Sequence, residues 1–200
     1  MSNTLYLVRH AHSQQTALPV ETWPLSELGR QQAQRLAELP FWQDVHIICA
    51  SIEPKALQTA QIVAARRDLP VEPVFDLREL RRPGSLVGDY ESAVRRVLEN
   101  PAASVNGWEP AGEAQMRIVT AIERGLMLHE DKTLAVVSHG LALTLYLADL
   151  TDILPSLELW QSISFASAIQ VDPDARMIIA RAEIRDSTPE ILGGTHAPSL

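Results

Sequence analysis

The chain has 200 residues, which is long enough for one domain that buries a substantial core without disulfides or metal ions. Seventeen lysines and arginines stand against 25 aspartates and glutamates, which gives a formal net charge of −8 at pH 7. General binders of nucleic acid or anionic membranes present basic surfaces. We therefore expect neither nucleic acid nor a membrane as a partner, and any recognition of phosphate must be local.

The single cysteine, Cys49, has no second cysteine for an intrachain disulfide, which suits a reducing compartment. In its apolar run it is interpreted as a small buried hydrophobic residue. The chain shows no export-signal pattern at its N-terminus and no run of about 18 apolar residues. These features predict a cytoplasmic protein and leave the oligomeric state open, a homodimer included.

Apolar runs and helical stripes alternate along the first 75 residues. Strand-like runs cover residues 5–8, 46–50 and 71–74. After the first run, Ser26 is expected to cap a helix that stops at Pro40, with one apolar face formed by Leu25, Leu28, Leu36 and Leu39. After the second run, Ser51 is expected to cap a helix with Pro54 in its first turn.

From residue 76 to residue 110, glycines and prolines interrupt the pattern around one short helix near 91–99. This segment either covers a functional site or is an ordinary surface insertion. Regular elements then return as a helix at 112–129, a strand at 133–137 and an apolar helix at 140–150. The last two strands, at 163–171 and 177–184, flank an Asp-Pro-Asp turn and predict a hairpin at a sheet edge.

This order of elements predicts the α/β class, as a three-layer α/β/α sandwich on a mixed, mainly parallel central sheet. We expect one domain over residues 1–185 and an irregular C-terminal tail over 186–200. In such a sheet the carboxyl ends of parallel strands lie along one edge, where ligands bind. The polar side chains expected at that edge are Arg9, His10, His12, Ser13, Ser51, Ser138 and His139.

These groups together suit phosphoryl transfer. A neutral imidazole is a competent nucleophile, so His10 is the candidate for covalent catalysis through a phosphohistidine. Arg9 offers a planar charged fork that matches two phosphoryl oxygens. His139, when protonated, can donate a further hydrogen bond, and the helix that begins at Gly140 adds free backbone N–H groups.

The leaving alkoxide in such a reaction needs a proton, which a carboxylic acid near the bound anion can supply. Glu79 is our candidate for this general acid. From the residues alone, Glu79 can also be a solvated loop residue that pairs with Arg78 or Arg81.

Short segments across most of residues 4–185 stand in a fixed order: LVRHAHS (7–13), PLSELGRQQA (24–33), SIEPKALQTA (51–60), LRE (77–79), PAGE (110–113) and VVSHG (136–140). In this order they resemble the histidine phosphatase superfamily, in its phosphoglycerate-mutase-like branch. The resemblance predicts that residues 1–185 are a histidine phosphatase-like catalytic domain.

The resemblance implies a histidine acid phosphatase-type phosphomonoesterase that acts on a small phosphorylated metabolite without cofactor or metal. In that mechanism His10 attacks, and Glu79 protonates the leaving group and then activates water. Arg9, His139 and Lys55 would bind the phosphate. The substrate-binding set that it implies is Arg9, Lys55, Ser13, Thr16 and Gly140.

The chain departs from the family pattern at three positions. Lys55 stands where the family usually has arginine, and lysine supplies a flexible point charge in place of a rigid fork. Ala11 replaces the usual glycine, which is tolerable only if its φ is negative. His12 occupies a position that is often acidic, and it either adds charge to the site or makes a local hydrogen bond.

Three other functions remain open at this stage. His10 and His12 have the H-x-H spacing of zinc hydrolases, although Arg9 and Lys55 would repel a cation. The lysine at position 55 fits a phosphate-binding module without turnover. A phosphoglycerate-type mutase is a third alternative, for which the chain is short.

The segment between residues 76 and 110 is expected to set specificity. The candidates for contact with a second anionic group or a ring of the substrate are Arg81, Arg82, Tyr90, Arg95, Arg96 and Trp108. Arg81 and Arg82 can equally form a solvated basic face. Trp23, Trp42 and Trp160 are interpreted as packing residues.

Overall fold

A computed structural model describes residues 4–83 and 88–184. Its sheet has six strands in the order β3-β2-β4-β1-β5-β6. The strands are β1 (Leu5–Arg9), β2 (Ile47–Ser51), β3 (Val71–Val74), β4 (Leu134–Ser138), β5 (Ser167–Asp172) and β6 (Met177–Glu183). The pairings of β1 with β4 and of β2 with β3 and β4 are parallel, whereas those of β5 with β1 and β6 are antiparallel. The predicted mixed, mainly parallel sheet with an edge hairpin is therefore confirmed.

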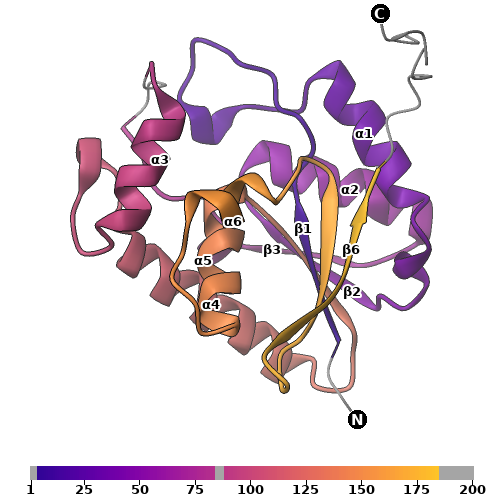
Figure 1. The fold of residues 1–200 in the computed structure, drawn as a ribbon. Coiled ribbons are helices and arrows are strands. Elements are labelled where there is room, and N and C mark those ends of the chain that lie inside the picture. Colours follow the sequence, from indigo (N-terminus) through magenta and orange to yellow (C-terminus); the bar gives the residue numbers. More distant parts are fainter. Residues whose placement is uncertain (1–3, 84–87, 185–200) are drawn as a thin grey trace, which may run out of the picture.

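Helices cover both faces of this sheet, as Figure 1 shows. They are α1 (Glu27–Ala37), α2 (Pro54–Arg67), α3 (Tyr90–Glu99), α4 (Ala111–Leu128), α5 (Gly140–Leu150) and α6 (Leu157–Gln161). Short 3-10 turns occur at Val20–Thr22, Pro40–Gln43, Phe75–Leu77 and Val105–Gly107. One apolar cluster joins α1 and α2 to one face, and a second joins α3, α4 and α5 to the other. These layers confirm the three-layer sandwich.

The alternation of side chains along β1 explains the two clusters. Leu5 and Leu7 belong to the cluster on the α4 and α5 side, whereas Tyr6 and Val8 belong to the cluster on the α1 and α2 side. A strand that is buried on both faces reads as a continuous apolar run, because both faces are covered by helices. The apolar runs in the sequence therefore mark central strands.

The first helix begins as predicted, but its apolar face differs. The Ser26 hydroxyl accepts a hydrogen bond from the N–H of Gly29 at 3.0 Å, which is the expected N-cap. The buried positions of α1 are Gly29, Ala33, Leu36 and Ala37. Leu28 is 48 % exposed, so its predicted place on the buried face is wrong. Leu25 precedes the helix, and helical spacing counted from it does not apply.

Two further local predictions are corrected. Ser51 is the last residue of β2 and does not cap α2, which begins at Pro54 after Glu53. The strand expected from residue 163 begins only at Ser167, because Ala166 has a left-handed backbone with φ of 52°. Residues 157–161 form the helix α6, which the sequence analysis missed.

The register of β1 and β4 brings the two predicted histidines together. Arg9 is paired with Ser138 at the carboxyl ends of these parallel strands, and the N–H of His10 donates to the Ser138 carbonyl at 3.0 Å. His10 and His139 therefore leave the sheet side by side at the same edge.

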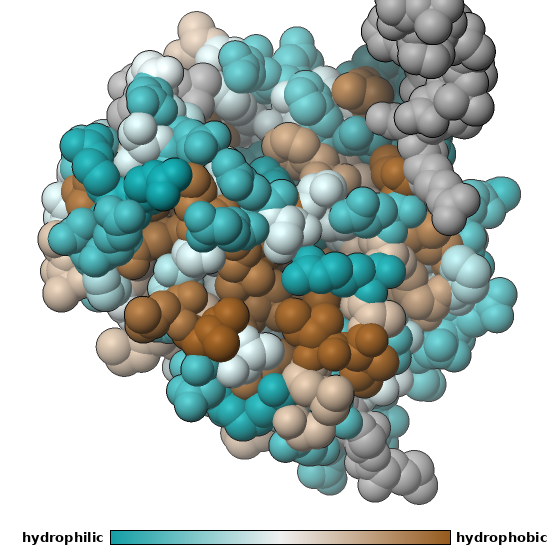
Figure 2. All heavy atoms as spheres, viewed as in Figure 1, coloured by the Kyte–Doolittle hydropathy of each residue, from teal (hydrophilic) through white to brown (hydrophobic). Residues whose placement is uncertain are grey.

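Figure 2 shows apolar surface gathered in the lower part of this face, over α5 and the β5–β6 hairpin. Large exposed apolar side chains occur at Ile153 and Leu154, in the segment that follows α5, and at Met177 and Ile179 on β6. Of the helices in the described residues, none has the length and apolar character needed to cross a membrane. Cytoplasmic location and a homodimer stay predictions, and the predicted tail over 186–200 lies outside the described residues.

Candidate active site

The two predicted histidines face each other at the carboxyl edge of the sheet. Their ring centroids are 5.0 Å apart and their planes are inclined by 62°. His10 Nδ1 lies 2.7 Å from the Ala11 carbonyl oxygen, which can only accept a hydrogen bond, so Nδ1 carries the proton. The lone pair of neutral His10 is then on Nε2. Burial, followed by the nearby His139 and Lys55, holds the pKa of His10 well below its usual value. His10 is therefore neutral at neutral pH, as a nucleophile requires.

His139 is fully buried, and its Nε2 lies 2.8 Å from the Ser51 hydroxyl. Its Nδ1 is buried and has no hydrogen-bond partner among the described residues. Burial, followed by the charges of Lys55 and Arg82, holds the pKa of His139 well below its usual value. In this state the imidazole is neutral, so the doubly protonated His139 considered above is not the resting form.

The Arg9 guanidinium is fixed beside these rings. Its Nη1 donates to the Ile163 carbonyl, and its Cζ lies 4.1 Å from the centroid of the Phe165 ring. Its Nε is buried without a partner among the described residues. A Cβ on Gly140 would lie 3.1 Å from Arg9 Cζ, so the guanidinium packs directly on the start of α5. Close approach explains why glycine stands at position 140.

Lys55 and Glu53 form a buried ion pair next to His139. The Lys55 ammonium contacts the Glu53 carboxylate and donates to the Val20 carbonyl at 3.0 Å. An ammonium has three N–H donors, so one donor remains for a ligand. Glu53 Oε1 also accepts from the Glu79 N–H at 2.8 Å and lies 3.6 Å from His139 Nε2. Glu53 connects the lysine, the second histidine and the loop of Glu79, and sequence reasoning missed it.

Glu79 is buried, and its carboxylate lies at the N-terminus of α5. It accepts hydrogen bonds from the backbone N–H groups of Leu80 at 3.1 Å, Leu141 at 3.1 Å and Ala142 at 3.0 Å. The positive end of the helix dipole favours a carboxylate there. The alternative of a solvated glutamate is therefore wrong. Two of the helix N–H groups that were expected to bind phosphate are bonded to Glu79 instead.

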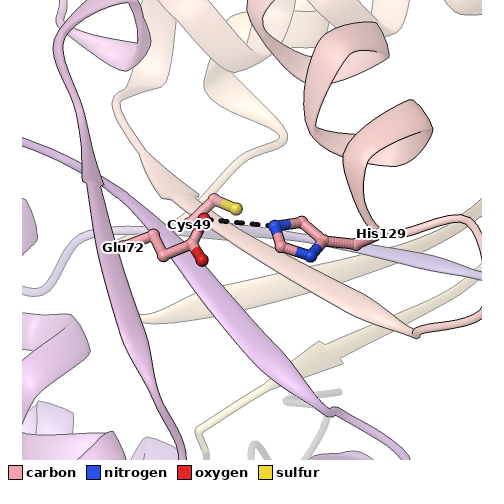
Figure 3. Close-up of side chains that lie close together, drawn as sticks. All are labelled: Cys49, Glu72 and His129. Atoms are coloured by element: carbon pink, nitrogen blue, oxygen red, sulfur yellow. Dashed lines mark hydrogen bonds and ion pairs between the residues drawn. The ribbon is translucent and has the colours of Figure 1, made fainter.

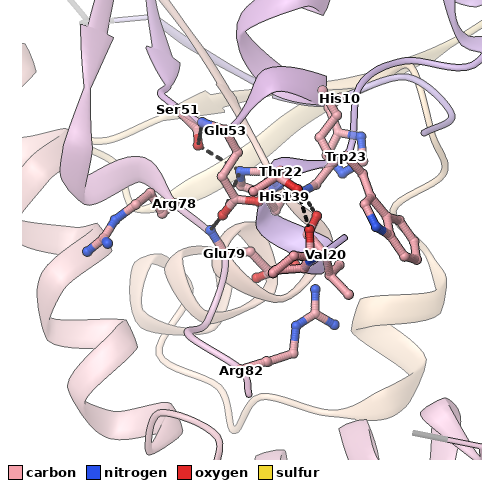
Figure 4. A network of polar contacts seen from close by, with 12 residues as sticks. His10, Val20, Thr22, Trp23, Ser51, Glu53, Arg78, Glu79, Arg82 and His139 are labelled. Carbon is pink, nitrogen blue, oxygen red and sulfur yellow. Dashed lines mark hydrogen bonds and ion pairs between the residues drawn. The ribbon is translucent and has the colours of Figure 1, made fainter. Parts of the chain in front are cut away.

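Figure 4 shows this polar network, in which Ser51, Glu53, Glu79 and His139 lie close together and Arg82 extends toward them. Beside it lies a cleft of about 230 Å³, which we call the carboxyl-edge cleft. Its lining residues are Arg9, His10, His12, Ser13, Gln15, Val20, Trp23, Lys55, Glu79, Arg82, Tyr90, Gly140, Trp160 and Phe165. One cleft thus brings together the predicted nucleophile, the predicted general acid and most of the predicted phosphate-binding residues. His139 is fully buried and is not among the lining residues, although its ring faces His10.

Some predicted residues have other surroundings. Thr16 is absent from the cleft lining, and its hydroxyl accepts from the Leu18 N–H at 3.2 Å within an exposed loop. His12 lines the cleft, and its Nδ1 lies 2.8 Å from the Ser26 hydroxyl, which is the local hydrogen bond considered above. Ala11 is not among the residues with positive φ, so the replacement of glycine carries no backbone strain.

The outer wall of the cleft is largely aromatic. Arg82 Nη1 donates to the Tyr90 hydroxyl at 2.6 Å, and the guanidinium lies 5.2 Å from the centroids of both Tyr90 and Trp108. Trp160, whose ring centroid is 5.9 Å from that of Tyr90, and Phe165 line the cleft near Arg9. Trp42 and Trp108 are buried packing residues. Trp23 and Trp160 also line the cleft, so packing is not their whole role. Phe165 had no sequence signal, because it lies in an irregular turn before β5.

The described residues do not provide a set of metal ligands around the H-x-H pair, His10 and His12. Within the described residues, the group of three side chains spaced to hold a metal ion is Cys49, Glu72 and His129, which includes neither His10 nor His12. The spacing expected of a zinc hydrolase therefore does not come with a third ligand at the cleft.

Comparison with known proteins agrees with this arrangement. The family model of the histidine phosphatase superfamily (branch 1) matches residues 5–178, and the chain belongs to that superfamily. A phosphatase or mutase type of activity follows from this membership. The resemblance inferred from the motifs is thus confirmed.

Two curated relatives carry names of this kind. The chain is 28 % identical to an Escherichia coli adenosylcobalamin/alpha-ribazole phosphatase over 173 residues, which cover 78 % of this chain and 82 % of the relative. It is 33 % identical to the probable phosphoglycerate mutase GpmB of an Enterobacter species over 155 residues, 70 % of each chain.

Solved structures share the fold. Bacillus stearothermophilus YhfR is 26 % identical with a TM-score of 0.68, covering 89 % of this chain and 95 % of its own. A mycobacterial glucosyl-3-phosphoglycerate phosphatase is 21 % identical with a TM-score of 0.69, covering 85 % and 90 %. The second likeness concerns the fold alone.

Proposed function

We propose that the protein hydrolyses small phosphate monoesters through a phosphohistidine on His10, without a metal in the reaction. The observation that carries this proposal concerns two buried polar atoms without hydrogen-bond partners among the described residues. One is Nε of Arg9, which lines the cleft that contains neutral His10, and the other is Nδ1 of His139, whose ring faces His10. Buried polar groups that lack partners cost free energy, and a phosphoryl group offers acceptor oxygens to both.

In the first step, His10 Nε2 attacks phosphorus, the P–N bond forms and the P–O bond to the alcohol breaks. The hydrogen bond from Nδ1 to the Ala11 carbonyl stabilises the positive charge that develops on the ring. Arg9 and the remaining donor of Lys55 neutralise the phosphoryl oxygens, and neutral His139 donates a hydrogen bond to them in the tautomer that carries its proton on Nδ1. In this proposal Glu79 carries a proton while the substrate is bound, because the negative phosphate opposes a second negative charge beside it, and it gives that proton to the leaving alkoxide.

In the second step, the Glu79 carboxylate takes a proton from water, and the water oxygen attacks phosphorus. The P–N bond breaks, inorganic phosphate leaves, and His10 and Glu79 return to their starting states. The bonds of Glu79 to Leu141 and Ala142 hold the carboxyl group in place for both transfers.

The cleft supports a substrate whose alcohol carries a flat ring. Tyr90, Trp160 and Phe165 offer aromatic faces, and Arg82 adds a cation. One curated relative is named an alpha-ribazole phosphatase, so the phosphate ester of α-ribazole is the first substrate to test. The name of the second relative makes phosphoglycerate interconversion the alternative.

The test is a panel of phosphorylated metabolites assayed with a chelator present, with release of inorganic phosphate as the readout. Quenching in alkaline denaturant after addition of substrate labelled in its phosphate should leave label on the wild-type chain that is stable in base and lost in acid, and none on His10→Ala. Interconversion of phosphoglycerates without release of phosphate would establish the mutase instead. Binding of phosphate without turnover of any ester would establish a non-catalytic member, and loss of turnover in the chelator would contradict metal independence.

A further inference from the structure

A second cluster of reactive side chains lies on the face of the sheet that α4 covers. Cys49 on β2 is paired in register with Glu72 on β3, and His129 follows the last residue of α4. Their ligand atoms all lie within 4.8 Å of one another, and His129 Nε2 is 3.1 Å from Glu72 Oε2. Figure 3 shows the three side chains converging, with the thiol next to the imidazole. We call them the Cys-Glu-His cluster.

This cluster is separate from the carboxyl-edge cleft. It lines a cavity of about 350 Å³ whose wall includes Asp76, Arg124 and Leu128 and shares no residue with the carboxyl-edge cleft. The proposed reaction uses none of its residues. The Cys49 thiol is buried, the His129 side chain is 15 % exposed and the Glu72 side chain is 50 % exposed. The cluster therefore has a buried end and an open end through which an ion can enter.

The chemistry of these groups selects one class of ligand. Thiolate, imidazole and carboxylate are the ligands of zinc, and three protein ligands leave a fourth position for water. Calcium and magnesium prefer sites made of oxygen alone. A thiolate and a carboxylate carry two negative charges, which a divalent cation neutralises. The other two charged residues of the cavity wall, Asp76 and Arg124, have opposite charges and add no net charge to the site.

A reactive thiol is a poorer explanation of the same cluster. Burial raises the pKa of Cys49 to about 11, so without a metal the sulfur is a protonated, weakly nucleophilic thiol. Glu72 and His129 then satisfy each other through their own hydrogen bond and leave the thiol aside. A soft divalent cation is the ligand that would use all three side chains together.

We propose that Cys49, Glu72 and His129 bind one Zn²⁺ ion, with water as the fourth ligand. Binding forms a Zn–S bond and releases the thiol proton to solvent. The ion joins β2, β3 and the end of α4, and therefore acts on the stability of the fold and not on phosphoryl transfer. This proposal stands independently of the proposed function.

The test uses the full chain without an affinity tag, stripped with a chelator and then titrated with Co²⁺, which gives an intense thiolate-to-metal charge-transfer absorption. The wild type should show this band saturating at about one equivalent, and Zn²⁺ should displace it. Cys49→Ser should lose the band. His129→Gln and Glu72→Gln should weaken binding at least about tenfold, because each removes one ligand.

Two controls separate this site from others. His46 is an exposed histidine outside the cluster, and His46→Gln should keep the wild-type titration. His10→Ala should also keep the band, which would exclude His10 as a ligand. Zn²⁺ should raise the thermal midpoint of the wild type, should raise that of His129→Gln less, and should leave that of Cys49→Ser unchanged. A wild type without the thiolate band, or a band that persists in Cys49→Ser, would overturn the proposal.

Discussion

The Lys55 ammonium and the Glu53 carboxylate form a buried ion pair, in which the Lys55 side chain is 4 % exposed and the Glu53 side chain is 6 % exposed. A buried pair of this kind is sensitive to the loss of one partner, because the other charge then lacks compensation. Lys55 also replaces the arginine that is usual in the family, so its role in stability must be separated from its role in phosphate binding.

Lys55→Met should destabilise the fold by roughly 3–5 kcal/mol, since it leaves Glu53 buried and unpaired. Adding Glu53→Gln should recover much of that loss. The double variant should still be slower, with kcat/KM reduced roughly 10- to 100-fold, because the charged donor to phosphate is gone. Urea unfolding and initial rates measure the two effects. Recovery of both stability and rate would show that Lys55 is only structural.

Lys55→Arg is the matched variant that keeps the charge. We expect it to hold or improve kcat and to lower KM, because the guanidinium fork suits phosphoryl oxygens better than a point charge does. The readout is kcat and KM for a generic aryl phosphate. Complete indifference of both constants would argue that position 55 does not touch the substrate.

Glu79→Gln should slow turnover in a manner that depends on the leaving group. An alkyl phosphate needs a proton on its departing oxygen and should lose about 10²- to 10⁴-fold in kcat, whereas an activated aryl phosphate should lose far less. The measurement is the loss in kcat for each of the two substrates with this one variant, and the difference between the losses tests the role of Glu79 as a general acid. Equal losses would indicate that Glu79 only positions the start of α5 through its bonds to Leu141 and Ala142.

Gly140→Ala should impair binding of the phosphate. The new Cβ would lie 2.9 Å from Trp160 Nε1 and 3.1 Å from Arg9 Cζ, and the guanidinium is fixed between Ile163 and Phe165. Displacement of Arg9 should reduce kcat/KM roughly 10- to 100-fold, the value of one charge-assisted hydrogen bond.

The control for this variant is Gly125→Ala in α4. Its Cβ would lie 3.4 Å from Leu134 Cδ2, an ordinary contact, so activity should be unchanged and stability should rise by up to about 1 kcal/mol. If both glycine variants leave kcat/KM unchanged, the position of Arg9 does not matter for binding.

Stability should fall in mild acid because of the two buried histidines. The pKa values of His10 and His139 lie well below the unfolded value of about 6.5, so below that pH the unfolded chain binds protons that the folded chain does not. Stability is then fully present above about pH 6.5 and decreases as the pH falls toward the folded pKa values. Each histidine contributes a slope of up to about 1.4 kcal/mol per pH unit.

Urea unfolding of the wild type and of His139→Gln, from about pH 7.5 down to about pH 5, measures this slope. In the variant, the free energy of unfolding should depend less steeply on pH, by the slope that corresponds to about one proton. Identical slopes in the two proteins would mean that His139 is protonated in the folded state, contrary to its neutral resting form.

Much of the scaffold could be predicted because its signals are local. The Ser26 cap, the helix at 140–150 and the edge hairpin follow from capping, apolar content and turn residues within a few positions. The errors at Leu28 and Ser51 have the same local origin, since a shift of one or two residues in where a helix begins changes which side chains cap it or face the core.

The site was partly predictable, because strand-end motifs place His10 and His139 at one edge once the sheet is parallel. Glu53 could not be assigned in this way. Its role depends on contacts with Lys55, Glu79 and His139, which are separated along the chain by up to 86 positions, from 53 to 139.

The order of apolar runs and the residues at their ends thus determined the α/β class and the placement of His10 and His139 at one sheet edge, because periodicity and turn chemistry act over short stretches of chain. Only the tertiary structure decided that Glu79 occupies the start of α5, that Tyr90, Trp160 and Phe165 wall one cleft, and that Cys49 meets Glu72 and His129. These contacts arise from packing between segments that are distant in the chain. A local pattern of residues does not specify which distant side chain a given residue will contact.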